Sequence, residues 1–175
     1  CGGRGTGAAL QAMQADPAVR VVALGDVFAD QIASSAEVLG AAGRQFDCPA
    51  ERRFVGQDAY RQVIDSGVDV VLLAGPPHTR PLHLEAAVAA GKHVYCEKPV
   101  AIDAAGVVRA AAAAARSRAA GLALVSGFCF RRDARMMELV ARLHDGAIGR
   151  PRDVQVHAAI GLPWRKPMDV SRGSG

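Results

Sequence analysis

A glycine-dense turn that leads directly into a helix-forming stretch is the first feature of this sequence that could do chemistry. The chain opens CGGRGTGAAL, and the turn consists of Gly2, Gly3, Arg4 and Gly5. Dinucleotide-binding turns read G-x-G-x-x-G, because glycines allow a tight turn, a close backbone approach to the pyrophosphate and close helix–strand packing. The amino end of the following helix then binds the phosphates. Gly2 and Gly5 fit the second and third glycines, so we expect the first glycine and a strand upstream of Cys1.

An acidic residue follows the turn at the distance where a ribose-binding acid belongs. Asp26 lies about twenty residues after the last glycine and ends the apolar run VRVVAL-G-D. Its carboxylate can accept hydrogen bonds from both ribose hydroxyls, and it repels a 2′-phosphate. Val27 and Phe28 offer no cation that would bind such a phosphate. These residues favour NAD over NADP, although Asp26 could instead cap the helix that follows.

Two later apolar runs also end in residues that could form part of a site. The segment AGPPHTR (74–80) contains Pro76 and His78, and the segment CEKP (96–99) contains Glu97 and Lys98. Ligands of open parallel sheets bind at the carboxyl ends of the strands, so these segments would meet at one edge. Considered alone, Lys98 would be interpreted as a solvated lysine, and His78 could be simply exposed.

Five stretches resemble the Gfo/Idh/MocA oxidoreductases, the family of glucose–fructose oxidoreductase, inositol dehydrogenase and the rhizopine-catabolism protein. In chain order they are GGRGTGAA, VVALGDVF, AGKHVYCEKP, and GFCFRRD with the later GAIGRPRDV. The resemblance implies a Rossmann domain, followed by a mostly antiparallel α/β domain that carries the substrate. It also implies that the chain is a fragment, without its first strand and most of the second domain.

The resemblance assigns roles to the residues of the Glu-Lys-Pro motif. It makes Lys98 the catalytic residue, whose amine takes the hydroxyl proton as hydride leaves the carbinol carbon and returns it in reduction. Burial and a cationic nicotinamide would lower the pKa of Lys98 toward that task. Glu97 would lie near the nicotinamide ribose, and a cis Lys98–Pro99 bond is expected. The cofactor-binding set is therefore Gly2, Gly3, Arg4, Gly5, Asp26, Pro76, His78, Glu97 and Lys98.

The function that the resemblance implies is an NAD(P)-dependent oxidoreductase. It would transfer hydride between the nicotinamide and a sugar, a cyclitol or a related polyol. Two alternatives stay open: an NAD-dependent glycosidase of the same family, and a non-catalytic NAD-binding fragment. The family also implies a homo-oligomer for the full-length protein, and either a cytoplasmic protein or one exported through a twin-arginine route.

Some positions depart from the family pattern or carry weaker indications. The family turn commonly reads T-P-N-x-x-H, whereas Pro77 and Arg80 replace its asparagine and histidine here, which puts side-chain contacts to the cofactor in doubt. Arg131 lies in a region that is close to the substrate in the family, or it is a surface arginine. Trp164 and its two basic neighbours could line a sugar pocket, or simply pack.

Strand-like and helix-like stretches alternate along the chain, and the strands are almost uniformly apolar. This pattern predicts an α/β protein with a Rossmann-type doubly wound parallel sheet covered on both faces. We expect the NAD-binding domain over residues 1–148 and the second, mostly antiparallel α/β domain over residues 149–175. The expected helices are 6–15, 30–42, 58–66, 81–90, 103–120 and 134–144. Asp58 is expected to cap the helix at 58–66, and four helices are expected to end at the glycines that follow them, Gly43, Gly67, Gly91 and Gly121. The expected strands are 19–24, 54–55, 68–74, 93–96, 122–126 and 153–160.

Composition excludes several other classes. Half of the residues are hydrophobic, and the net charge of +4 is spread over interleaved acidic and basic residues, so we expect no nucleic-acid partner. No apolar run is long enough to cross a bilayer, so no membrane partner is expected. The four cysteines form no CxxC pair and no Cys/His spacing fits zinc, which predicts no metal site and reduced, mostly buried thiols.

Overall fold

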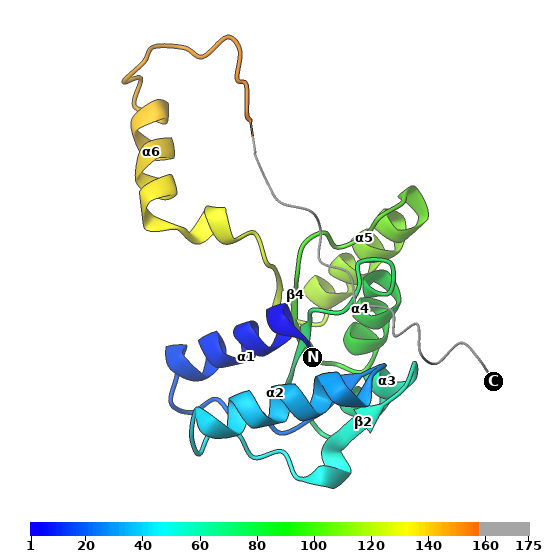
Figure 1. Cartoon of the computed structure of the whole chain (residues 1–175). Coiled ribbons are helices and arrows are strands. Elements are labelled where there is room, and N and C mark those ends of the chain that lie inside the picture. The colour runs from blue at the N-terminus through cyan, green and yellow to red at the C-terminus, as the bar shows by residue number, and fades with distance from the viewer. Residues whose placement is uncertain (158–175) are drawn as a thin grey trace, which may run out of the picture. The chain divides into compact units, whose positions relative to one another are not determined.

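The computed structural model describes residues 1–157, and it has the α/β architecture of a Rossmann-type fold (Figure 1). The chain divides into two compact units, Cys1–Arg131 and Arg132–Gly175. This division falls earlier than the expected domain boundary near residue 149, which stays a prediction. Of the elements within residues 1–157, all the strands and five of the six α-helices lie in the first unit.

Helices and strands alternate along the first unit as the sequence predicts. The α-helices are α1 (Gly3–Ala15), α2 (Ala29–Ala41), α3 (Ala59–Asp65), α4 (Arg80–Ala89) and α5 (Ala104–Ala119). The strands are β1 (Leu24–Asp26), β2 (Arg53–Val55), β3 (Val70–Leu73), β4 (His93–Cys96) and β5 (Leu124–Ser126). Two short 3-10 helices are η1 (Ala50–Arg52) and η2 (Cys129–Arg132).

The strands form two parallel sheets, where the sequence analysis expects one. β1 pairs with β2, and β4 lies between β3 and β5. Within residues 1–157, β1 and β3 are edge strands of separate sheets and do not pair with each other. Helix α1 contacts both α2 and β3, so it joins the two halves of the unit. The preceding strand that the sequence analysis expects stays a prediction.

The strand expected at residues 19–24 is shifted toward its carboxyl end. Val21 forms only an isolated parallel bridge with Phe46, and regular pairing begins at Leu24, opposite Arg53. A regular strand needs hydrogen-bonded pairing at successive residues. Here the partner chain lies alongside at two separate places, first at Val21 and again from Leu24 onward. The apolar run therefore marks chain that is mostly half-buried and becomes buried at Leu24, whereas the position of β2 decides where β1 starts.

Helices α4 and α5 cover one face of the β3–β4–β5 sheet. Val71, Leu73, Val94 and Cys96 alternate along β3 and β4 into a core shared with α4 and α5. Ala87 and Ala113 are fully buried there, and their small side chains let the helices approach closely.

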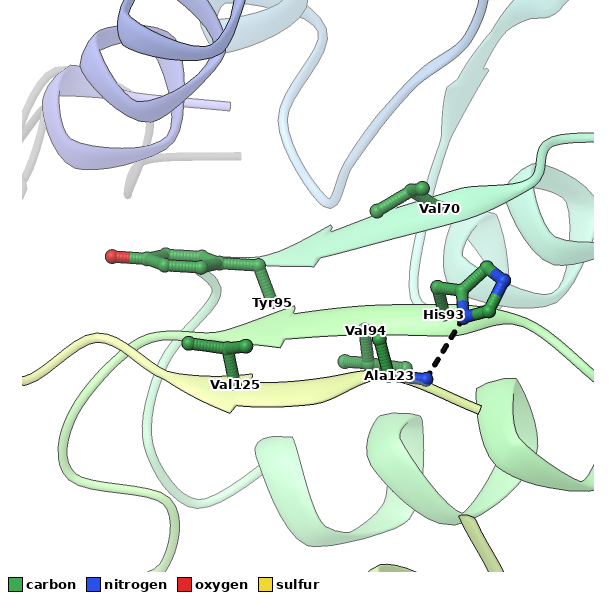
Figure 2. Close-up of a pocket in the computed structure, with 6 residues that line it drawn as sticks. All are labelled: Val70, His93, Val94, Tyr95, Ala123 and Val125. Carbon is green, nitrogen blue, oxygen red and sulfur yellow. Dashed lines mark hydrogen bonds between the residues drawn. The ribbon is translucent and has the colours of Figure 1, made fainter. Parts of the chain in front are cut away.

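The opposite face of this sheet is not covered within the first unit, which corrects the expectation that helices cover both faces. Val70 is 53% exposed and Val125 is 44% exposed. Figure 2 shows them with Tyr95 around a shallow, largely apolar hollow that His93, Val94 and Ala123 also line.

The helix ends follow the sequence in most cases. The glycines expected to end helices all have positive φ, namely Gly43, Gly67, Gly91 and Gly121. At α4, for example, Gly91 (φ 73°) reverses the chain so that Lys92 N–H reaches Ala87 O at 3.0 Å.

The aspartate expected to cap the helix at residues 58–66 does not do so. Asp58 accepts no capping hydrogen bond at α3 and pairs instead with Arg61, at 3.4 Å. Its backbone has φ −91° and ψ 3°, which is not the extended conformation that an N-cap usually needs. Asp103, in contrast, is extended, and its carboxylate accepts from Gly106 N–H at 2.6 Å at the start of α5.

The second unit contains α6 (Ala134–His144), at the bounds that the sequence predicts. Asp133 caps this helix by accepting hydrogen bonds from the N–H groups of Arg135 and Met136. The strand expected at 153–160 is absent over residues 153–157, where no partner strand is present, and its last residues lie outside the described part.

We predict that the two aspartates differ in their contribution to stability. Asp103→Ala should lower the free energy of unfolding by about 1 kcal/mol, because a capping hydrogen bond is lost. Asp58→Ala is the matched control, and it should change the free energy of unfolding by less than about 0.5 kcal/mol. Urea denaturation of both variants measures the difference, and equal effects would contradict the assignment of the caps.

Candidate cofactor site

The glycine turn forms the amino end of α1, and that end is open to an anion. Gly2 is the N-cap with φ 86°, a conformation that residues with side chains rarely adopt. No side chain caps the helix and no acidic residue lies in its first turn. The first N–H groups of a helix have no partner within it, so these donors suit a phosphate. A Cβ on Gly5 would lie 3.4 Å from Ala74 Cβ, which shows how closely α1 approaches the end of β3.

Asp26 lies beside this turn, at the end of β1. Its Oδ2 is 3.0 Å from the amino nitrogen of Cys1, and its Oδ1 accepts from Phe28 N–H at 3.0 Å. The turn and the acid are therefore adjacent, as a dinucleotide site requires. The N-cap position of α2 is occupied by Phe28, two residues after Asp26, so the alternative in which Asp26 caps this helix is wrong.

A buried carboxylate links the glycine turn to the Glu-Lys-Pro segment. Glu97 is only 4% exposed, and its Oε1 lies 2.6 Å from Arg4 Nη2 and 2.7 Å from Arg4 Nε. Tyr95 donates its hydroxyl to the same oxygen at 3.2 Å, and Lys98 N–H donates to Oε2 at 3.3 Å. Arg4 and Glu97, which are 93 positions apart in the sequence, are thus held together at one edge of the fold.

The charge of Glu97 is stabilised by these partners. Burial by itself would raise the pKa of Glu97, but the hydrogen bonds and the positive charge of Arg4, with help from Tyr95 and Lys98 N–H, hold it below its ordinary value. The hydrogen bond to Glu97 likewise raises the pKa of Arg4. Glu97 is therefore a carboxylate at neutral pH, with one oxygen bound only by a backbone N–H.

A glycine makes room for this carboxylate. A Cβ on Gly127, just after β5, would lie 2.8 Å from Glu97 Oε1 and 2.9 Å from Tyr95 Oη. Such a distance is too short for a real side chain. The sequence analysis names neither Gly127 nor Tyr95. A glycine directly after an apolar strand was the available signal for a close approach.

Lys98 follows Glu97 at the carboxyl end of β4. The Lys98–Pro99 bond is cis, as the sequence analysis expects. Lys98 is exposed, so the burial that was expected for it is not supplied by residues 1–157. Arg80 is 6% exposed and donates from Nη1 to the backbone oxygens of Glu97 and Pro99, at 3.0 and 2.6 Å.

The other expected residues are less closely connected with this cluster. Pro76 and His78 lie in the turn before α4, where both are exposed, and neither side chain bonds Glu97 or Lys98 in the described part of the chain. Arg131 is also exposed. Trp164 and its basic neighbours lie outside the described residues.

The cysteines and histidines form no metal site among residues 1–157. No group of three His, Cys, Asp or Glu side chains comes together there. The four cysteines are free; Cys48 and Cys96 are buried and the side chain of Cys1 is only 3% exposed, so the thiols are mostly buried as expected, and Cys129 is the exception. In the same residues, no helix has the length and hydropathy to span a bilayer.

We predict that Glu97 makes stability depend on pH in the acid range. A depressed pKa in the folded state gives stabilisation that is complete above the ordinary glutamate pKa, about 4.3, and is lost as the pH falls through the lower folded value. The difference in unfolding free energy between the wild type and Glu97→Gln should therefore shrink between pH 7 and pH 3. In an Arg4→Met background the pH dependence of this difference should be smaller. A difference that grows on acidification would contradict the assignment.

Comparison with known proteins identifies the fold. The family described as "Oxidoreductase family, NAD-binding Rossmann fold" (Gfo/Idh/MocA) matches residues 1–123. The chain is 29% identical over 153 residues to myo-inositol 2-dehydrogenase of Thermotoga maritima, covering 87% of this chain and 41% of that protein. It thus spans about two fifths of the length of that relative.

Solved structures agree with the sequence match. An oxidoreductase domain protein from Kribbella flavida superposes with a TM-score of 0.67 at 28% identity, over 82% of this chain and 38% of that one. KijD10, a 3-ketoreductase from Actinomadura kijaniata in complex with NADP and TDP-benzene, superposes with a TM-score of 0.62 at 27% identity, over 81% and 39%. The chain therefore belongs to the Gfo/Idh/MocA oxidoreductase family, whose NAD-binding Rossmann fold it carries.

Proposed function

We propose that the full-length protein is an NAD-dependent oxidoreductase that acts on a cyclitol, a sugar or a related polyol. One observation carries the proposal: the contact of Arg4 with Glu97, which holds the glycine turn beside the segment that ends in Lys98. A diphosphate site and a proton-transfer group must lie at one edge of the sheet for this chemistry. The relative from Thermotoga maritima, named for its action on myo-inositol, supports the cyclitol class.

The residues of the chain fit a dinucleotide. The uncapped amino end of α1 would hold the diphosphate through the N–H groups of Gly3, Arg4 and Gly5. Asp26 would accept hydrogen bonds from the adenosine ribose hydroxyls, which favours NAD. The partly unused Glu97 Oε2 would accept from the nicotinamide ribose. A bound nicotinamide supplies the acceptor or donor of hydride.

Lys98 would serve as the proton-transfer residue. Its amine takes the proton of the substrate hydroxyl as hydride leaves the adjacent carbon, and it gives a proton to the carbonyl oxygen in reduction. The Glu97 carboxylate is already bound by Arg4 and Tyr95, so it is not the free base of this site. Pro76 and His78, in the exposed turn before α4, would border the cofactor.

We predict that Lys98→Met lowers kcat by about 10²- to 10⁴-fold in the full-length protein, because general acid–base catalysis contributes an effect of that size. The Kd for NAD should change by less than about threefold, since no diphosphate or ribose contact is removed. Absorbance of reduced cofactor at 340 nm, with myo-inositol and a panel of polyols, measures turnover.

Lys92→Met, at the other end of β4, is the matched control and should keep wild-type turnover. Wild-type kcat in Lys98→Met would remove Lys98 from the mechanism. Release of the aglycone from a chromogenic glycoside, without net reduction of NAD, would instead support the glycosidase alternative. NAD binding without turnover of any substrate would support the non-catalytic alternative.

We predict that Asp26 sets the cofactor preference. Asp26→Ala should weaken NAD binding by about tenfold, because hydrogen bonds to a charged group are lost, and it should improve NADP binding relative to NAD. Asp26→Asn keeps hydrogen-bonding capacity without the charge, so it should relieve the repulsion of the 2′-phosphate with a smaller loss of NAD affinity. Calorimetric titration with both cofactors measures this. An unchanged NAD/NADP ratio in both variants would remove Asp26 from cofactor recognition.

A further inference from the structure

Arg80 has an unusual environment for an arginine. It is the first residue of α4, yet its side chain is 6% exposed and points to the Glu97–Pro99 segment instead of solvent. Burial lowers the pKa of Arg80, and within residues 1–157 its guanidinium forms no ion pair. Its Nε is buried and has no hydrogen-bond partner there. Both features cost free energy, so the contacts made by Nη1 must offset that cost.

Those contacts are made on both sides of Lys98. Nη1 donates to the carbonyl oxygen of Glu97, at 3.0 Å, and to that of Pro99, at 2.6 Å. One carbonyl precedes Lys98 and the other follows it. Two hydrogen bonds from a single nitrogen therefore fix the backbone from which the Lys98 side chain projects.

We propose that Arg80 is a positioning residue, which holds the backbone on both sides of Lys98 and thereby aims the Lys98 amine at the substrate. The proposal rests on the proposed function for the role of Lys98. Lysine should replace Arg80 only in part, because its ammonium can donate to both carbonyls but its side chain is shorter and reaches them less well.

The test compares Arg80→Met and Arg80→Lys with the wild type in the full-length protein. Hydrogen–deuterium exchange of the peptide that covers residues 96–101 reports the backbone without any cofactor or substrate. We expect exchange there to be about tenfold faster in Arg80→Met, because both carbonyl contacts are lost, and intermediate in Arg80→Lys. Arg116→Met is the matched control: Arg116 is exposed on α5 and pairs with Glu85 at 3.2 Å, and its loss should leave this peptide unchanged.

Kinetics provide the second readout. We expect Arg80→Met to lower kcat by about 10- to 100-fold, with the KM for NAD within about threefold of the wild type, because a displaced catalytic group costs turnover more than binding. Arg80→Lys should restore part of kcat. Adding Arg80→Met to Lys98→Met should cause no further loss, because a residue that acts through Lys98 has no effect without it.

The outcomes separate this proposal from the proposed function. Unchanged exchange and unchanged kcat in Arg80→Met would overturn the positioning role of Arg80. Faster exchange that is spread equally over α4 and α5 would overturn it as well. If Arg80→Met does not fold, Arg80→Lys decides by the same two readouts. Wild-type kcat in Lys98→Met would overturn the proposed function, while local exchange in Arg80→Met would still show whether Arg80 holds the segment.

Discussion

The fold and its site depend on one buried negative charge. Glu97 lies at the carboxyl end of β4 with 4% of its surface exposed, and a carboxylate in that position is stable only if it is hydrogen-bonded and paired. Arg4 supplies the opposite charge from the first turn of α1, and Tyr95 and Lys98 N–H supply further donors. The need to satisfy Glu97 therefore brings the glycine turn to the segment that carries Lys98.

Small residues make this arrangement possible. Gly127 leaves space for the Glu97 carboxylate, and Gly5 lets α1 approach Ala74 at the end of β3. Ala87 and Ala113 do the same between α4 and α5. The many glycines and alanines of this chain are thus matched to close contacts between elements, which large side chains would prevent.

Two arginines act on the same short segment in different ways. Arg4 neutralises the side chain of Glu97, whereas Arg80 binds backbone oxygens on both sides of Lys98. The first contact is half exposed at its arginine, and solvent therefore screens it, while the second is buried. Together they hold the segment around Lys98, whose own side chain is exposed.

Local features of the sequence determined most of the elements. Apolar periodicity, the helix-ending glycines and the Asp103 cap depend on residues a few positions apart, so the helices and four of the five strands of the first unit fall close to their predicted places. The glycine turn, Asp26 and the Glu-Lys-Pro segment were also evident as motifs. The sequence alone therefore determined the α/β class and the identity of the main candidate residues.

Only the tertiary structure decided which of these residues meet. The start of β1 depends on where β2 comes alongside, and the partner of Glu97 lies 93 residues away. The inward direction of the Arg80 side chain and the space left by Gly127 also depend on segments that are distant in sequence. No periodicity or spacing encodes such contacts, because each one arises from the packing of segments that are distant in sequence, and the energy of a buried polar group depends on all its neighbours at once.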